Sequence, residues 1–161
     1  MSNNNLSFLE RILLAFSTFF RILSEPSFAA AAYEVIRPSV VLVHSPGAET
    51  EGEENDRERS GAVGTGVVIV DSGIILTALH VVMDADAVLV VFADGSESPA
   101  AVIARQPEND LAVLQALVIP DDLIPATMAG SGMLQVGDEV AAVGHPFGVP
   151  NSLSAGVVSG L

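Results

Sequence analysis

The chain has no cysteine and no lysine. Without cysteine it has no disulfide framework and no thiolate metal site, and this absence says little about the compartment. All 6 basic residues are arginines, against 20 acids, which gives a formal net charge of −14 at pH 7. Such a surface repels nucleic acid and anionic lipid headgroups, because both are bound through basic side chains. We therefore expect no nucleic-acid partner.

The N-terminal residues lack the uninterrupted apolar run of a membrane span. Residues 6–23 are rich in Leu, Ile and Phe, but Glu10, Arg11 and Arg21 interrupt them, whereas a bilayer span needs about 20 apolar residues. The sequence predicts an amphipathic, apolar helical segment over residues 1–28. Three interpretations stay open for it: a signal peptide or anchor, a helix that lies on a membrane or partner, or a helix that packs on the domain.

Short β-branched segments dominate the rest of the chain. Half of the residues are hydrophobic, so 161 residues suffice for one domain with a core. A short helix is predicted over residues 29–36. Strands are predicted over residues 39–44, 62–70, 74–77, 87–92, 98–105, 111–116, 139–143 and 153–158. Short strands with glycine-containing turns are typical of an antiparallel barrel or sandwich, and the first six strands suffice for one barrel.

One long segment between the first two predicted strands has no apolar periodicity. Residues 45–60 contain six acids and two arginines. This composition predicts a solvated surface loop rather than a further core element.

A histidine and an acid stand at the ends of two predicted strands. His80 follows the strand over residues 74–77, and Asp110 directly precedes the strand over residues 111–116. A lone histidine is more often a surface or core residue, and an acid in a turn is more often a solvated cap. The apolar residues 111–114, however, are expected to draw Asp110 toward the core and against His80. An imidazole held by a buried acid is the base-and-orienter half of a nucleophilic site.

A metal site is the rival use of the histidines. His44, His80 and His145 together with Asp110 offer nitrogen and oxygen ligands, but no pair has the spacing of ligands on one helix or short loop. We therefore expect neither a metal nor another cofactor.

Six segments, in this order, resemble the HtrA (DegP/DegQ/DegS-like) branch of the trypsin-like serine proteases. They are residues 37–41, 64–69, 73–82, 110–114, 136–140, and 144–148 together with 155–159. The resemblance runs from about Tyr33 to Leu161. Each segment alone is weak evidence for the resemblance, whereas six segments in the order of the family form a specific pattern. His145 departs from the family, which usually has asparagine or serine there.

The resemblance implies an all-β fold, a chymotrypsin- or trypsin-like antiparallel β-barrel preceded by the N-terminal helix. It divides the chain into the helical segment 1–28, a complete first barrel over residues 29–130 with the acidic loop 45–60, and a second barrel begun over residues 131–161. It implies an N-terminal part of a serine endopeptidase that hydrolyses peptide bonds in unfolded or damaged proteins without a cofactor. Location in the cell envelope or periplasm, or at a membrane, is also implied, and a homo-oligomer stays open.

In this family His80 would be the general base and Asp110 the acid that holds it, but the nucleophile has no match. The Gly-Asn-Ser-Gly-Gly-type turn of the family does not occur in the 161 residues. The serines considered are Ser131, Ser152, Ser154 and Ser159. Ser131 falls in the expected connection between barrels, and Ser159 is expected in a strand. The chain alone is therefore expected to be inactive, and the alternative is a non-catalytic pseudoprotease that binds a partner.

Overall fold

The computed structural model describes residues 27–45 and 61–161, apart from residues 84 and 86. The helix expected over residues 6–23 and nearly all of the acidic loop expected over residues 45–60 lie outside the described residues. No helix in the described ranges is long and apolar enough to cross a bilayer.

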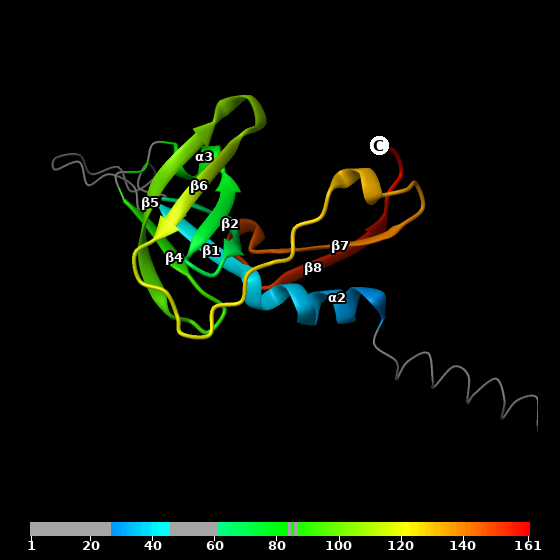
Figure 1. Ribbon diagram of the computed structural model, residues 1–161, viewed down its shortest axis with the longest axis horizontal. Helices are drawn as coiled ribbons and strands as arrows, with labels where there is room; N and C mark the ends of the chain where they lie inside the picture. Colours follow the sequence, from blue (N-terminus) through cyan, green and yellow to red (C-terminus); the bar gives the residue numbers. More distant parts are fainter. Residues whose placement is uncertain (1–26, 46–60, 84, 86) are drawn as a thin grey trace, which may run out of the picture.

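Six antiparallel strands close into a barrel (Figure 1). They are β1 (Val40–Ser45), β2 (Ala62–Val70), β3 (Ile74–Ala78), β4 (Val88–Val91), β5 (Glu97–Gln106) and β6 (Leu111–Ala116). The order around the barrel is β1-β2-β3-β6-β5-β4, and the pairing of β1 with β4 closes it. Closure leaves none of these strands with a free edge. The prediction of one antiparallel barrel is confirmed, and the sandwich is excluded.

The core fills the inside of this barrel because alternate residues of each strand face inward. In β1 the inward residues Val41 and Val43 have no exposed surface, and in β6 Ala112 and Leu114 are equally buried. The short helix α3 (Leu79–Val82) adds Leu79, Val81 and Val82 to the same cluster. The core therefore supports the residues that follow β3 and precede β6.

Two hairpin turns depend on glycine. Gly73 between β2 and β3 has φ +85°, and Gly95 between β4 and β5 has φ +88°. This left-handed region is readily available only to glycine. The glycine-containing turns predicted between short strands are confirmed at both positions.

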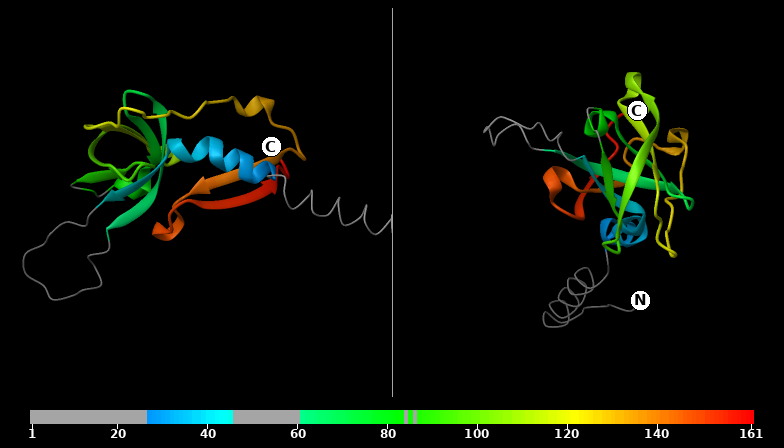
Figure 2. Two further views of the ribbon diagram at one scale, coloured as in Figure 1. Left: turned by 90° about the horizontal axis from the view of Figure 1, so that it is seen from below. Right: turned by 90° about the vertical axis from the view of Figure 1, so that its left-hand side faces the viewer.

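A second, smaller sheet lies beside the barrel. It consists of β7 (Glu139–Gly144) and β8 (Ser152–Val157), paired antiparallel. The helix α2 (Phe28–Ile36) packs against this hairpin, as the view from below in Figure 2 shows. Ser159 lies beyond the end of β8, so the expectation of a strand there is wrong.

Candidate catalytic site

His80 is placed by the junction of β3 and α3. Thr77 and Leu79 face the core, and the single turn of helix that follows β3 turns His80 outward. The Thr77 hydroxyl donates a hydrogen bond of 2.9 Å to the backbone carbonyl of Thr65 in β2. This bond fixes the end of β3 three residues before His80.

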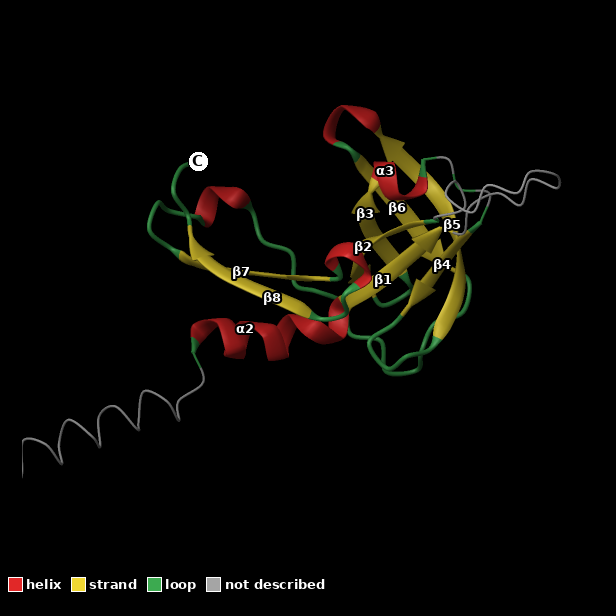
Figure 3. Ribbon diagram, turned by 180° about the vertical axis from the view of Figure 1, so that it is seen from behind, coloured by secondary structure: helices red, strands yellow, loops and turns green. Residues whose placement is uncertain are grey.

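Asp110 is placed by the turn between β5 and β6. The turn of 3-10 helix η2 (Pro107–Asn109) ends at Asp110, whose backbone is left-handed with φ 50° and ψ 44°. Aspartate tolerates this conformation better than most residues do. The tip of the β5–β6 hairpin and α3 lie at the same end of the barrel (Figure 3). The carbonyl of Asp110 accepts a hydrogen bond of 2.9 Å from the backbone N–H of Leu79.

The register of β3 and β6 brings the two side chains together. Ala78 pairs with Leu111, so the residues just after β3 meet the residue just before β6. Asp110 Oδ1 accepts from the backbone N–H of His80 at 2.9 Å, and Asp110 Oδ2 lies 2.5 Å from His80 Nδ1. The predicted approach of His80 and Asp110 is confirmed, while their catalytic roles stay a prediction.

The hydrogen bonds determine the charge of the acid and the tautomer of the ring. The bond from the His80 side chain, followed by the bond from the His80 backbone N–H, lowers the pKa of Asp110 below its ordinary value of 3.8. The carboxylate is therefore ionised at neutral pH and only accepts hydrogen bonds. From this we assign the proton to Nδ1, which leaves Nε2 of His80 as the basic atom.

The pair is more exposed than the sequence suggested. The side chain of His80 is 67% exposed and that of Asp110 is 52% exposed. The expectation that residues 111–114 draw Asp110 into the core is wrong, because Asp110 is still in the turn at the rim. Burial begins only two residues later, at Ala112.

The candidate serines do not complete a nucleophilic site. Ser131 begins the 3-10 turn η3 (Ser131–Met133), Ser152 and Ser154 belong to β8, and Ser159 follows it. In the described part of the chain no serine hydroxyl forms a hydrogen bond with the ring of His80. The arrangement supplies a base and the acid that orients it.

No metal site emerges from the same region. Among the described residues no group of three or more His, Asp or Glu side chains is arranged to hold a metal ion.

His145, the histidine that departs from the family pattern, is buried where the β7–β8 sheet meets the barrel. It is 7% exposed, and its backbone N–H donates a hydrogen bond of 2.8 Å to the hydroxyl of Thr65. Its Nδ1 accepts from the backbone N–H of Asn151 at 3.3 Å. Burial lowers the pKa of His145 below its ordinary value of 6.5. The backbone of His145 thus ties the end of β7 to the barrel, and its buried, neutral ring accepts a hydrogen bond from the β7–β8 connection.

Comparison with known proteins places this arrangement in a family. Residues 64–161, more than half of the chain, match the trypsin-like peptidase domain. The chain belongs to the trypsin-like peptidases. The matched region contains both His80 and Asp110.

Its relatives lie in the HtrA branch, as the resemblance implied. The chain is 40% identical over 102 residues to a probable periplasmic serine endoprotease DegP-like of Brucella suis, with 63% of the chain and 20% of the relative covered. It is 38% identical over 101 residues to the periplasmic serine endoprotease DegP of Escherichia coli K12, with 62% and 21% covered. The trypsin-like peptidase chain therefore spans about a fifth of the length of these curated relatives.

Solved structures agree with the sequence relatives. The HtrA-type protease AlgW with tripeptide superposes with a TM-score of 0.70 at 29% identity, covering 83% of this chain and 40% of that one. The HtrA-type protease AlgW with decapeptide gives a TM-score of 0.69 at 26% identity, covering 83% and 46%. The chymotrypsin-like barrel that the resemblance implied is confirmed for this peptidase chain.

Proposed function

We propose that this chain forms part of an HtrA-like serine endopeptidase in which His80 is the general base and Asp110 the acid that orients it. The hydrogen-bonded pair at the rim of the barrel is the observation that carries the proposal. The serine endoproteases among the relatives support it.

The chemistry follows from the free Nε2 of His80. As a serine hydroxyl attacks the carbonyl carbon of a peptide bond, Nε2 takes the hydroxyl proton and later delivers it to the leaving amine. Asp110 keeps Nδ1 protonated and stabilises the imidazolium that forms between these two steps. Water, activated by the same nitrogen, then hydrolyses the acyl-enzyme. The serine of this reaction is not assigned to any residue of the 161.

Substrates and location are part of the same proposal. We infer that unfolded proteins or peptides are the substrates, since structures of the related AlgW contain a tripeptide and a decapeptide. The relatives named periplasmic support a location in the cell envelope or periplasm. The rival function, a non-catalytic binding module, is less favoured because the hydrogen bonds that a base needs are intact.

The test uses the full-length gene product that contains this chain, with an unfolded protein such as casein as substrate. His80→Ala removes the base, and we expect kcat to fall by about 10⁴-fold or more. Asp110→Asn keeps the shape but favours the wrong tautomer of His80, and a loss of about 10⁴-fold is expected. Glu108→Gln is the matched control, because it neutralises an exposed acid of the same turn that forms no hydrogen bond or ion pair with His80 in the described part of the chain.

The control variant should retain wild-type kcat, and circular dichroism should show that all variants are folded. Absence of cleavage by the wild-type full-length protein, or unchanged cleavage by His80→Ala, would reject the proposal and favour the binding module.

A further inference from the structure

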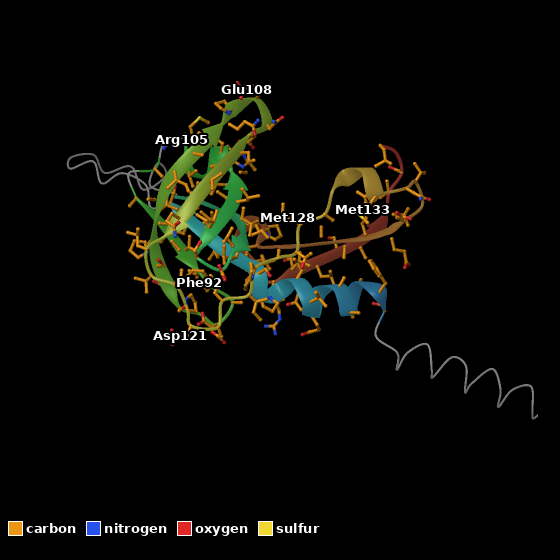
Figure 4. The ribbon with its side chains drawn as sticks, viewed as in Figure 1. Phe92, Arg105, Glu108, Asp121, Met128 and Met133 are labelled. Carbon is orange, nitrogen blue, oxygen red and sulfur yellow. The ribbon has the colours of Figure 1, made fainter. Side chains whose placement is uncertain are left out.

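The end of the barrel remote from His80 is hollowed into a pocket of about 290 Å³. The 3-10 turn η1 (Arg37–Ser39), the turn after β4 and the connection that follows β6 line it. Figure 4 places Phe92 and Asp121 at this end of the barrel and Glu108, next to the candidate catalytic pair, at the other end. A ligand in this pocket therefore does not reach His80.

Part of the pocket wall is apolar and continuous with the core. Phe92 is 5% exposed and belongs to the core cluster, and Leu123 packs against that cluster. Ile124, at 53% exposure, extends the apolar surface outward. An apolar side chain placed here would remove this surface from water, which is favourable by about 25 cal/mol per Å².

A cation and two acids line the same pocket without neutralising one another. Arg37 pairs with Glu34 at 3.8 Å on the solvent side, and among the described residues neither Asp94 nor Asp122 lies within 4.0 Å of its guanidinium. The Nε of Arg37 is buried and has no hydrogen-bond partner in the described part of the chain. Among the described residues Glu34 is thus the one ionic partner of the guanidinium.

The acid at the turn after β4 is fixed and charged. Asp94 Oδ1 accepts hydrogen bonds from the backbone N–H of Ser96 at 2.8 Å and from its hydroxyl at 2.7 Å. These two bonds, the side-chain bond first, lower the pKa of Asp94. The lining of the pocket therefore includes a positive and a negative group on separate elements, together with apolar surface.

A ligand that matches all three features is a zwitterion with an apolar body. A simple anion would be repelled by Asp94 and Asp122 and by the net charge of −14, and a simple cation would make no favourable contact with Arg37. A free peptide carboxylate suits the planar fork of a guanidinium, and a peptide ammonium suits a carboxylate. The volume is at the lower end of ligand pockets, which favours a small peptide.

We propose that this pocket binds short apolar peptides whose amino and carboxyl ends are both free, with the carboxylate at Arg37 and the ammonium at Asp94 and Asp122. Such peptides are products of the hydrolysis proposed above, and the inference depends on that function only for the source of the ligand.

The test is a titration of the full-length protein with Leu-Leu, monitored by calorimetry or by amide chemical shifts. N-acetyl-Leu-Leu and Leu-Leu amide serve as matched ligands that each remove one charge. Each should bind about tenfold more weakly than Leu-Leu, since each loses one charge-assisted hydrogen bond. Because this comparison needs no variant, failure of a variant to fold does not affect it.

Variants locate the site. Arg37→Gln and Asp122→Asn should each weaken Leu-Leu binding by about tenfold, whereas Asp121→Asn, a neighbouring acid outside the lining, should not. His80→Ala should leave binding unchanged, so that failure of peptide binding and failure of proteolysis are distinguishable. Equal binding of blocked and free peptides, no binding at all, or shifts confined to the end near His80 would overturn the proposal.

Discussion

Asp110 holds the residues around His80 through three acceptor atoms of one turn. Its carbonyl oxygen accepts from Leu79, and its two carboxylate oxygens accept from the backbone and the ring of His80. Because the same left-handed residue supplies all three, the orientation of the ring depends on the conformation of one residue. Aspartate suits this position both as an acceptor and by its tolerance of positive φ.

The titration of His145 gives a prediction at the same scale. Burial lowers its pKa below 6.5 in the folded protein, so at lower pH the unfolded chain binds a proton that the folded chain does not. The free energy of unfolding should therefore fall as pH drops below about 6.5, by no more than about 1.4 kcal/mol per pH unit. Urea unfolding between pH 7.5 and 5 measures this slope.

The matched variant is His145→Asn, which should flatten the slope between pH 6.5 and 5. Asp94 and Asp110 affect stability in a different pH range. Because their pKa values are lowered from 3.8, the stability that their charged forms add is complete above pH 3.8 and is lost as the pH falls below it. A slope near pH 6 that persists in His145→Asn would show that another group is responsible.

At the residue scale the sequence predicted the pairing of His80 with Asp110, because both stand at strand ends within family motifs. It did not predict their exposure, since the position of Asp110 at the rim depends on where the β5–β6 turn ends. Nor did it predict the position of His145, whose backbone hydrogen bond to Thr65 joins residues 80 positions apart in the chain.

At the scale of elements, the β2–β3 turn relies on the absence of a side chain at Gly73. A Cβ at Gly73 would lie 2.5 Å from Ile119 Cγ2, whereas a Cβ at Gly95 would have no neighbour within 4 Å, and both residues have positive φ. Gly95→Ala should lower the free energy of unfolding by about 1 kcal/mol through backbone strain alone. Gly73→Ala adds overpacking and should lower it by about 2–4 kcal/mol.

Urea unfolding of both variants at pH 7 checks this order, and the difference between them isolates the steric part. Equal losses would mean that Ile119 moves aside, so that the turn is not limited by packing.

The strands themselves could be predicted to within one or two residues, because β-branched runs and turn residues are local signals. The order of strands in the barrel could not be derived from these signals. The pairings of β3 with β6 and of β1 with β4 join segments far apart in the chain, and only the family resemblance pointed to them.

At the scale of the whole molecule, the barrel and the β7–β8 hairpin differ in whether their strands have unpaired edges. Every barrel strand has two neighbours, while in the described part of the chain β7 and β8 have one each. Leu153 and Val157, on the same face of β8, are 41% and 61% exposed. An open edge with exposed apolar side chains is a template for pairing with another chain.

We therefore expect the 161-residue chain on its own to self-associate through β8. Val157→Lys places a charge on the exposed face of this strand and should shift the chain toward monomer, because a charged edge disfavours pairing. Val63→Lys is the matched control: it introduces the same charge at an exposed valine, 39% accessible, on a strand of the closed barrel. Sedimentation velocity over a range of concentrations distinguishes the variants. A wild-type chain that stays monomeric at all concentrations would contradict self-association. Equal effects of the two substitutions would contradict an assembly through β8 and indicate that the barrel surface takes part.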